Sequence, residues 1–351
     1  MPAALARPLR FAVAAANHPH IYLQTDALLE AGAELASFWV TEPELAAEFQ
    51  ARYPAANRTT DLLAILEDPA ISLVTCAAIF AERASLGIAA MEHGKDVLMD
   101  KPGFTTLAQL EQVRAVQART GRFYCIYFNE RLNDPATLTA AALVHAGAIG
   151  RPVQTIGLGP HRLRPATRPA WFFDPARYGG ILNDLASHQA DQFLFFTGAK
   201  DAKIAHARAA NTAHPQFPGF QDFGEVLFQA EEVSGFALVD WLSPEGLGTW
   251  GDERLFILGT DGYIEVRRNC DLEGRSGGSH LFLVDSSGSR YLECSTGPSP
   301  FARAFLGDVL GRTQTAFSLE HDFAASRLAL EAQIVANRSN HSLQFSRRSM
   351  R

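Results

Sequence analysis

The sequence predicts an α/β protein: an N-terminal doubly wound parallel sheet, followed by an α+β domain with a largely antiparallel sheet. Up to about residue 128, short apolar runs alternate with helix-like stretches, which is the pattern of βαβ units. Beyond about residue 203, apolar runs follow one another with turn signals between them, such as Asp261-Gly262, which favours β-hairpins. We therefore expect one domain over residues 1–128 and a second over residues 129–351.

The first domain opens with an apolar strand over residues 10–16 and a helix over residues 19–31. Pro19 suits the first turn of that helix, and Gly32 suits the position just past its end. Further strands are expected at 33–40, 71–78, 96–99 and 122–128, with helix-like stretches around 61–65, at 82–94 and at 105–120. Strands separated by helices of this length indicate a parallel sheet with both faces covered.

The second domain begins with a helical piece near residues 135–147, which is followed by "RPVQTIGLG" at 151–159. An Arg- and Pro-rich loop, "HRLRPATRPAW", follows at 161–171, and a long helical segment is expected from near Gly180. The chain then alternates strands, namely "FGEVLFQA", "SGFALVDW", "RLFILG", "GYIEVR" and "HLFLVD". A last helix is expected at 320–338.

The composition restricts the possible partners and compartment. The 351 residues are 47% hydrophobic and 20% charged, with a formal net charge of -7, which argues against a nucleic-acid or anionic-membrane surface. The cysteines are scattered without a Cys-x-x-Cys pair, so we expect reduced thiols rather than a zinc site or disulfides. We see no signal peptide and no apolar run of membrane-spanning length, and we expect a cytoplasmic protein.

The stretch "FAVAAANHPHIY" (residues 11–22) ends the first strand and opens the first helix, where nucleotide-binding proteins place Gly-x-Gly-x-x-Gly. This chain has Ala15, Asn17 and His20 at those positions. Asn tolerates positive φ better than most residues, so Asn17 is expected to keep the loop geometry. Free N–H groups at the helix start would still bind an anion, although Pro19 removes one donor.

Two more stretches fall at the carboxyl ends of the expected strands, where ligands collect in open α/β sheets. One is "AAIF" at 77–80, and the other is "DKP" at 100–102. Lys101 follows an apolar strand directly and is restricted by Pro102. Such a lysine can stabilise negative charge that develops on a substrate oxygen. The alternative is a surface lysine in a turn.

The segment "YGGILNDLASHQADQFLFFTG" (178–198) carries a possible acid–base pair. On a helix, Asp184 and His188 lie four residues apart on one face, and Asp191 lies one turn further. A carboxylate beside an imidazole can orient it and raise its basicity, which suits a general base. The alternative is a structural hydrogen bond.

Taken together, "DKP", "GAIGRPV" (147–153) and the Gly-Gly…Asp-x-x-x-His-x-x-Asp segment resemble the Gfo/Idh/MocA family of glucose–fructose oxidoreductases and inositol dehydrogenases. The resemblance implies a Rossmann domain followed by a sheet domain, a small polyhydroxylated substrate, NAD or NADP, and a homo-oligomer (dimer or tetramer). By this resemblance Lys101 holds and acidifies the reacting hydroxyl, and His188 takes its proton. Asp184 binds substrate hydroxyls or orients His188.

The departures from the family pattern lie at the nucleotide. The acidic residue expected about twenty positions after the loop falls at Val40. Its absence would remove repulsion against a 2′-phosphate, so NADP is slightly favoured over NAD, with Thr41 as a phosphate contact. Arg83 replaces a frequent His, and could reshape the nicotinamide end or attract an acidic substrate. The expected cofactor-binding residues are Ala15, Asn17, His18, His20, Thr41, Ala78, Ile79, Phe80 and Lys101.

The sequence also permits other interpretations of the arginines, of the His18-x-His20 pair and of the fold. Three arginines within seven residues (Arg162, Arg164, Arg168) suit carboxylate or phosphate recognition, or a solvated loop. No role is assigned to Arg131. The His18-x-His20 pair also fits a metal hydrolase barrel, but the hairpins after residue 203 disagree with that fold, and we expect no metal. The same fold could also keep a tightly bound nucleotide for lyase or glycosidase chemistry, or bind a small molecule without redox exchange.

Overall fold

The computed structural model describes residues 8–294 and 297–349, and its internal contacts divide the chain into two compact units. Unit 1 comprises Met1–Tyr127 and Pro298–Phe323, and unit 2 comprises Phe128–Gly297 and Ala324–Arg351. Residues 1–7, which the sequence pattern assigned to the first domain, lie outside the described part. The expected division after residue 128 stays a prediction, and the grouping of Pro298–Phe323 with unit 1 is a feature that the sequence pattern did not indicate.

Unit 1 is built on one parallel sheet of six strands in the order β3-β2-β1-β4-β5-β6. Its elements are β1 (Arg10–Ala14), α1 (His20–Glu30), β2 (Glu34–Trp39), α2 (Pro43–Arg52), β3 (Asn57–Thr59), α3 (Leu63–Leu66), β4 (Leu73–Cys76), the 3₁₀ turn η1 (Phe80–Glu82), α4 (Arg83–Glu92), β5 (Asp96–Asp100), α5 (Leu107–Thr120), β6 (Tyr124–Tyr127), α11 (Pro300–Gly311) and the start of α12 (Leu319–Ser349).

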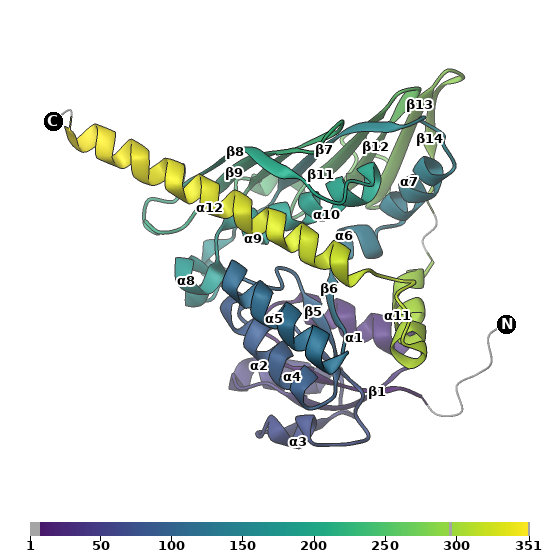
Figure 1. Ribbon diagram of the computed structural model, residues 1–351, viewed down its shortest axis with the longest axis vertical. Helices are drawn as coiled ribbons and strands as arrows, with labels where there is room; N and C mark the ends of the chain where they lie inside the picture. Colours follow the sequence, from purple (N-terminus) through teal and green to yellow (C-terminus); the bar gives the residue numbers. More distant parts are fainter. Residues whose placement is uncertain (1–7, 295–296, 350–351) are drawn as a thin grey trace. The chain divides into compact units, whose positions relative to one another are not determined.

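The sheet of unit 1 is covered on both faces. Figure 1 shows α4 and α5 in front of the strands, and the view from behind shows α1 and α2 on the opposite side. Every residue of β4, β5 and β6 is buried as a result, which explains their continuous apolar runs. The strand order reverses between β1 and β4, so the carboxyl ends of β1, β4 and β5 border the ligand-binding edge of this fold.

The returning segment Pro298–Phe323 completes unit 1. The ring of Phe301 lies 5.6 Å from that of Tyr127, and the ring of Phe317 lies 5.2 Å from that of Phe123 (centroid to centroid). The carboxylate of Asp322 accepts a hydrogen bond from the backbone N–H of Ile126 at 2.9 Å. The segment therefore covers β6, the edge strand of the sheet, with apolar and polar contacts.

Unit 2 is built on one sheet of eight strands in the order β14-β13-β12-β11-β7-β10-β9-β8. All neighbouring strands are antiparallel except β7 and β10, which are parallel. Its elements are α6 (Asn129–Leu132), α7 (Pro135–His145), β7 (Pro152–Pro160), η2 (Pro165–Thr167), η3 (Ala170–Phe173), α8 (Pro175–Tyr178), α9 (Ile181–Asp184), α10 (Ala186–Thr197), β8 (Lys203–Ala210), β9 (Phe223–Gln229), β10 (Ser234–Asp240), η4 (Glu245–Leu247), β11 (Glu253–Gly259), β12 (Gly262–Arg268), β13 (Ser279–Asp285), β14 (Gly288–Leu292) and the rest of α12.

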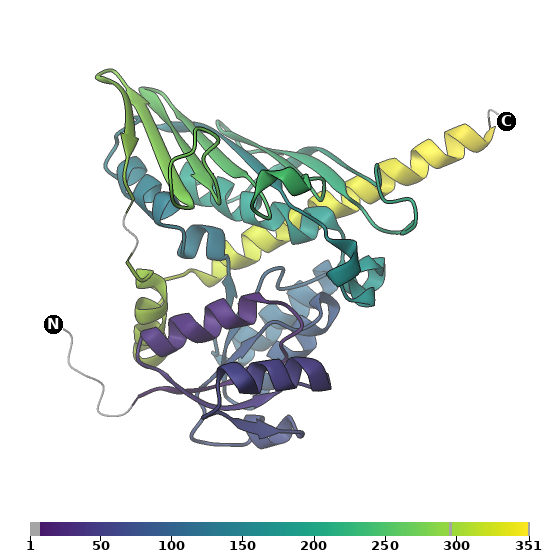
Figure 2. The ribbon, with the colours of Figure 1, turned by 180° about the vertical axis from the view of Figure 1, so that it is seen from behind.

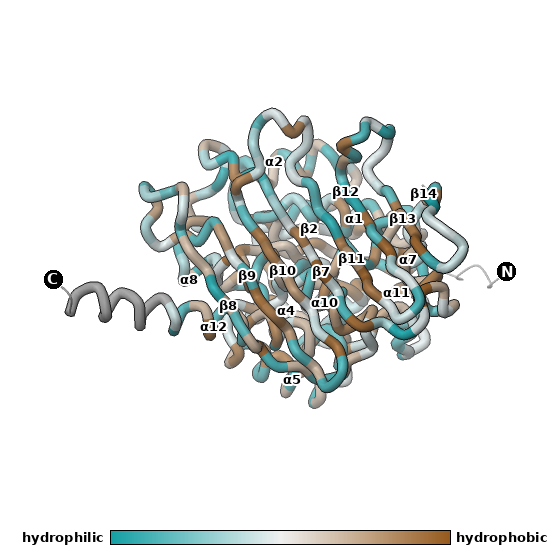
Figure 3. The backbone as a smooth tube through the Cα atoms, turned by 90° about the horizontal axis from the view of Figure 1, so that it is seen from above, coloured by the Kyte–Doolittle hydropathy of each residue, from teal (hydrophilic) through white to brown (hydrophobic). Residues whose placement is uncertain are grey.

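One face of this sheet packs against helices. Burial alternates along β9, β10, β11 and β12, and Figure 3 shows hydrophobic segments in the central strands. Helix α10 contacts β7 and β10, while α7 contacts β12. The approach of α10 to β7 is close, because a Cβ atom on Gly157 would lie 2.3 Å from Cγ of Gln189.

The fold class predicted from the sequence is confirmed, including the hairpin at Asp261-Gly262 between β11 and β12. The long helix expected from near Gly180 is instead two helices, α9 and α10, separated at Leu185. Within the described residues, the structure contains no helix whose length and apolar character would let it cross a membrane.

Candidate active site

The loop after β1 keeps the backbone of a dinucleotide-binding turn without its glycines. Ala15 has a φ of 69°, the left-handed region that usually requires glycine. Its N–H donates to the carbonyl of Trp39 at 2.8 Å, and the N–H of His18 donates to the carbonyl of Ala77 at 3.0 Å. The left-handed residue is thus Ala15 and not Asn17, whose role is a side-chain hydrogen bond.

Asn17 Nδ2 donates to Oε1 of Glu42 at 2.7 Å, and Thr41 Oγ1 donates to Oε2 of the same carboxylate at 2.9 Å. Val40, where the acidic residue was expected, is buried. Glu42 lies just beyond β2 and precedes α2, so a carboxylate does follow this strand. Sequence reasoning missed it because the usual spacing was applied too strictly; the signal was an acidic residue before Pro43, which opens a helix.

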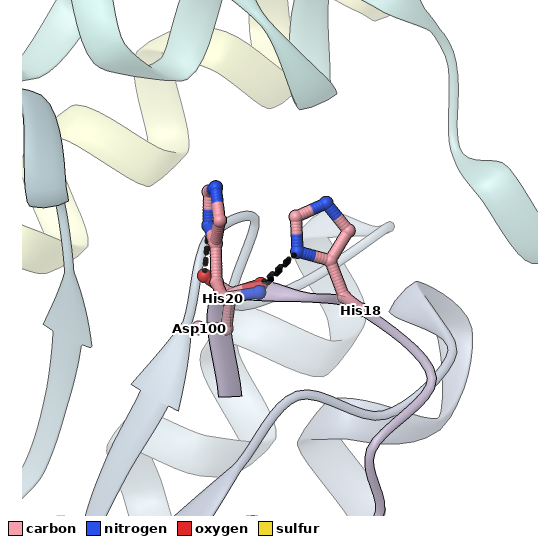
Figure 4. Close-up of side chains that lie close together, drawn as sticks. All are labelled: His18, His20 and Asp100. Atoms are coloured by element: carbon pink, nitrogen blue, oxygen red, sulfur yellow. Dashed lines mark hydrogen bonds and ion pairs between the residues drawn. The ribbon is translucent and has the colours of Figure 1, made fainter. Parts of the chain in front are cut away.

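The side chains of His18, His20 and Asp100 form one cluster (Figure 4). His20 Nδ1 lies 2.9 Å from Oδ1 of Asp100, and His18 Nδ1 lies 3.2 Å from Oδ2. Burial, together with the neighbouring His20, lowers the pKa of His18 to about 3. His18 is therefore neutral at physiological pH. The sequence pattern singled out both histidines but did not predict that they meet the aspartate of "DKP".

Arg83 fixes the other side of this cluster. Its side chain is fully buried, and its Nη2 donates to Oδ2 of Asp100 at 2.9 Å. Nε donates to the carbonyl of Ala78, and Nη1 donates to the carbonyls of Asp100 and Pro102. Burial alone would raise the pKa of Asp100, but His20 and Arg83 outweigh it and hold that pKa well below its ordinary value. Arg83 thus has a structural role and does not present its charge to a substrate.

Lys101 follows β5 directly and is buried, 3% exposed. A cis peptide bond joins it to Pro102, and its two flanking residues supply the carbonyls that Arg83 binds. Ile79 and Phe80, after β4, are also buried, and the Arg83 guanidinium lies 4.3 Å from the Phe80 ring centroid. The lysine is therefore a positioned group at a strand end and not a surface residue in a turn.

In unit 2, Asp184 ends α9 and interacts with Tyr178. Burial and the negative charge of Asp184, to which its hydroxyl hydrogen-bonds, raise the pKa of Tyr178 well above its ordinary value. Tyr178 Oη also accepts a hydrogen bond from Trp241 Nε1 at 3.2 Å. The guanidinium of Arg168 lies 4.9 Å from the Trp241 ring centroid and 4.6 Å from that of Phe172. Asp184 thus lies in a group of aromatic side chains beside a stacked arginine.

His188, in the first turn of α10, faces Glu130. Its Nε2 lies 3.4 Å from Oε1 of Glu130, and both side chains are buried. The other oxygen of Glu130 accepts hydrogen bonds from Gln192 Nε2 at 3.0 Å and from Arg268. Glu130 was not predicted as a site residue, because it lies far from His188 in the sequence and only the fold brings α6 to α10.

The remaining arginines singled out in the sequence are explained by their contacts. Arg131 forms a buried ion pair with Asp191, its Nε lying 2.9 and 2.8 Å from the two carboxylate oxygens. Arg162 is buried and donates to the carbonyls of Pro244 and Glu245. Arg164 is exposed. Of the three loop arginines, Arg168 is the one stacked on aromatic rings close to Asp184.

The expected site residues therefore belong to two units. The loop residues 15–20, Thr41, residues 78–80 and Lys101 belong to unit 1, whereas Asp184 and His188 belong to unit 2. The residues present in unit 1 fit a dinucleotide, on the evidence of the left-handed Ala15, the carboxylate of Glu42 after β2 and the strand order.

Comparison with known families matches both parts of the chain. The family model described as "Oxidoreductase family, NAD-binding Rossmann fold" matches residues 13–128, and the model of the GFO/IDH/MocA C-terminal domain matches residues 137–265.

Similar proteins and structures agree with these matches. A levoglucosan dehydrogenase of Pseudarthrobacter phenanthrenivorans is 31% identical over 235 residues, which cover 65% of this chain and 57% of that protein. A scyllo-inositol 2-dehydrogenase (NAD(+)) of Bacillus subtilis is 27% identical over 231 residues, covering 65% and 62%. The chain thus spans less than two thirds of the length of these curated relatives.

Among solved structures, a protein from Erwinia carotovora atroseptica named only as an oxidoreductase has a TM-score of 0.91 and 40% identity, covering 93% of this chain and 98% of that one. A levoglucosan dehydrogenase in complex with NADH has a TM-score of 0.78 at 19% identity, covering 95% and 98%, and supports the fold alone.

Proposed function

Because the chain belongs to the Gfo/Idh/MocA family of oxidoreductases with an NAD-binding Rossmann fold, we propose that it is a dehydrogenase acting on a CH–OH group. Its substrate is a sugar, a cyclitol or a related polyhydroxylated compound. The observation that carries the proposal is Lys101, a buried lysine at the carboxyl end of β5 in a sheet of Rossmann order. The names of the relatives, dehydrogenases of levoglucosan and of scyllo-inositol, support the same substrate class.

The cofactor of this proposal is a nicotinamide dinucleotide, held at the carboxyl ends of β1, β4 and β5. Bound there, such a cofactor would supply the acceptor for a hydride from the carbinol carbon of the substrate. Ala15 shapes the turn between β1 and α1, and Glu42 binds ribose hydroxyls. A carboxylate at the end of β2 repels a 2′-phosphate, which favours NAD, whereas the sequence pattern slightly favoured NADP. Thr41, whose hydroxyl donates to Glu42, supports the carboxylate and stays among the proposed cofactor-binding residues.

In the proposed reaction, Lys101, His188 and Asp184 each have a separate role. The ammonium of Lys101 stabilises the negative charge that develops on the substrate oxygen when the substrate hydroxyl loses its proton. His188 takes that proton on its imidazole, and the carboxylate of Glu130 keeps the ring oriented. Asp184 binds substrate hydroxyls, with the aromatic side chains around it forming an apolar wall.

Nucleotide binding and turnover test the proposal in two steps. The purified protein is first denatured, and any released nucleotide is identified by mass spectrometry. The nucleotide-free protein is then titrated with NAD and NADP, and a panel of cyclitols and sugars is screened for reduction of the cofactor. We expect saturable NAD binding and oxidation of at least one polyol. A nucleotide that cannot be exchanged would point instead to internal redox chemistry of the lyase or glycosidase type.

Matched variants then test the residue roles. Lys101→Met and His188→Asn should each lower kcat by about 100-fold or more. Lys203→Met and His206→Asn, both at exposed positions of β8, should leave it unchanged. Full activity in both catalytic-site variants would overturn the assignment. Assembly into a homo-oligomer and a cytoplasmic location stay predictions.

A further inference from the structure

The cluster of His18, His20 and Asp100 has the composition of a metal site. Each residue offers one ligand atom, and these atoms all lie within 4.8 Å of one another. Two imidazoles with one carboxylate are a donor set that zinc and other divalent first-row metals accept. We propose that these three side chains bind a divalent transition-metal ion, with Zn²⁺ as the reference ion.

The contacts in the cluster are similar in length to the separations between ligand atoms around one metal ion. Metal–ligand bonds of about 2.0–2.1 Å at tetrahedral angles place neighbouring ligand atoms about 3.3 Å apart. His20 Nδ1 lies 2.9 Å from Oδ1 of Asp100, and His18 Nδ1 lies 3.2 Å from the other oxygen, Oδ2. Opening these contacts by a few tenths of an ångström, with small rotations of the rings, would place an ion between the three side chains.

The backbone brings these ligands together for reasons that do not depend on the metal. His18 lies in the loop after β1, His20 opens α1, and Asp100 is the last residue of β5. The backbone N–H of His18 is bound to the carbonyl of Ala77, which holds the loop over the end of β4 between the two strands. The imidazoles therefore face the carboxylate without a long-range rearrangement.

The charges at the cluster also suit a cation. Asp100 is fully buried, so its negative charge is poorly solvated. Arg83 occupies one position on Oδ2 and, through the carbonyls of Ala78 and Pro102, holds the carboxylate in place, as outer-shell partners do in metal sites. A carboxylate offers about four lone-pair sites, so positions remain for an ion. Repulsion from the guanidinium should make the site weaker than closed structural zinc sites.

The alternative is a hydrogen-bonded cluster without an ion. His20 Nδ1–H would then donate to Asp100. His18 Nδ1 lies 3.2 Å from Asp100 Oδ2 and 3.3 Å from the backbone N–H of His20. Because an imidazole nitrogen carries either a proton or a free lone pair, Nδ1 of His18 cannot donate to the first and accept from the second at once. With an ion bound, Nδ1 of His18 would use its one lone pair as a ligand, so the contact with Asp100 would run through the ion and the 3.3 Å contact with the His20 N–H would be given up.

Metal binding is measured on the nucleotide-free protein without an affinity tag, after treatment with a chelator. We expect zinc titration followed by elemental analysis to give one ion per chain. Co²⁺ should give visible d–d absorption bands that Zn²⁺ abolishes by competition. A protein that retains no Zn²⁺ and develops no Co²⁺ bands would overturn the proposal, whatever the outcome of the nucleotide titration.

Variants locate the ion. His18→Asn and His20→Asn should each weaken Zn²⁺ binding by more than about tenfold, while circular dichroism remains unchanged. His145→Asn, an exposed histidine at the end of α7, is the matched control and should bind like the original chain. Asp100→Asn should also abolish Zn²⁺ binding, but it removes the carboxylate that Arg83 binds. The histidine variants are therefore the decisive test of the site. Equal Zn²⁺ affinity in His18→Asn, His20→Asn and the control would overturn the assignment.

Discussion

Replacing Arg83 with leucine should destabilise the protein far more than removing an arginine from an equally short surface ion pair. Arg83 and Asp100 are both fully buried, with Nη2 and Oδ2 2.9 Å apart. Arg119 and Glu92 lie 2.7 Å apart, but their side chains are 63% and 44% exposed. The two pairs have similar geometry and opposite burial, so Arg119→Leu is a matched control.

The expected magnitudes follow from burial. Removing one partner of a buried pair leaves an uncompensated charge and costs about 3–5 kcal/mol. The three carbonyls bound by Arg83 lose their donor as well. An exposed pair contributes about 0.2–1 kcal/mol. For a unit of about 150 residues, each kcal/mol lowers Tm by about 2–4 °C, so Arg83→Leu should lower Tm by about 6–20 °C and Arg119→Leu by at most about 4 °C.

The assay is thermal and urea unfolding of both variants beside the original chain, followed by circular dichroism. Activity is measured in parallel, because two of the carbonyls bound by Arg83 belong to the residues on either side of Lys101. We expect a loss of both stability and turnover in Arg83→Leu. A change in Tm no larger than that of the control would refute the reasoning that this cation compensates a buried carboxylate.

Three further predictions concern single residues. Glu42→Ala should raise the preference for NADP over NAD by about tenfold, because repulsion of the 2′-phosphate is removed, as measured by kcat/KM with each cofactor; an unchanged ratio would exclude Glu42 from ribose binding. Glu130→Gln should lower kcat less than His188→Asn does. Because His188→Asn should lower kcat by about 100-fold, a smaller loss can be measured. Equal losses would contradict a positioning role for Glu130. Burial alone would raise the pKa of Asp308, but hydrogen bonds from Thr313, Ala316 and Thr315 outweigh it and lower that pKa. Because the ionised form is favoured on folding, the contribution is present above the ordinary aspartate pKa and is lost as the pH falls through the lower folded pKa. Asp308→Asn should therefore destabilise by about 2 kcal/mol at pH 7, and the deficit in urea unfolding should shrink below about pH 4; a deficit that does not change with pH would contradict this.

Much of the fold could be predicted from the sequence because its strands are regular. Continuous apolar runs marked the parallel strands of unit 1, and period-two alternation marked the hairpins of unit 2. Short elements escaped: β3 (Asn57–Thr59) is polar and β14 (Gly288–Leu292) is mostly exposed, so neither has an apolar pattern. Helix α11 (Pro300–Gly311) was not predicted, nor was its place in unit 1, since packing partners far apart in the chain leave no local signal.

The candidate site was predictable only in part, for similar reasons. Lys101, Asp184 and His188 lie in recognisable motifs, so they could be proposed from spacing. The partners that the structure adds, such as Glu130 and Arg83, act through contacts made by folding. Glu130 comes from α6 and meets a residue of α10, and the role of Arg83 depends on complete burial, which a charged residue in a sequence does not suggest.

The return of Pro298–Phe323 to unit 1 has a consequence for how this protein can be divided or recombined. A gene fragment that ends near residue 128 encodes a sheet whose edge strand lacks the cover provided by Phe301, Phe317 and Asp322. Such a fragment should be prone to aggregate through the uncovered apolar surface and the open strand edge. Exchange of cofactor domains between homologues by a single crossover would meet the same difficulty. A functional chimera therefore requires the exchange of two separate segments, the N-terminal part of unit 1 and Pro298–Phe323.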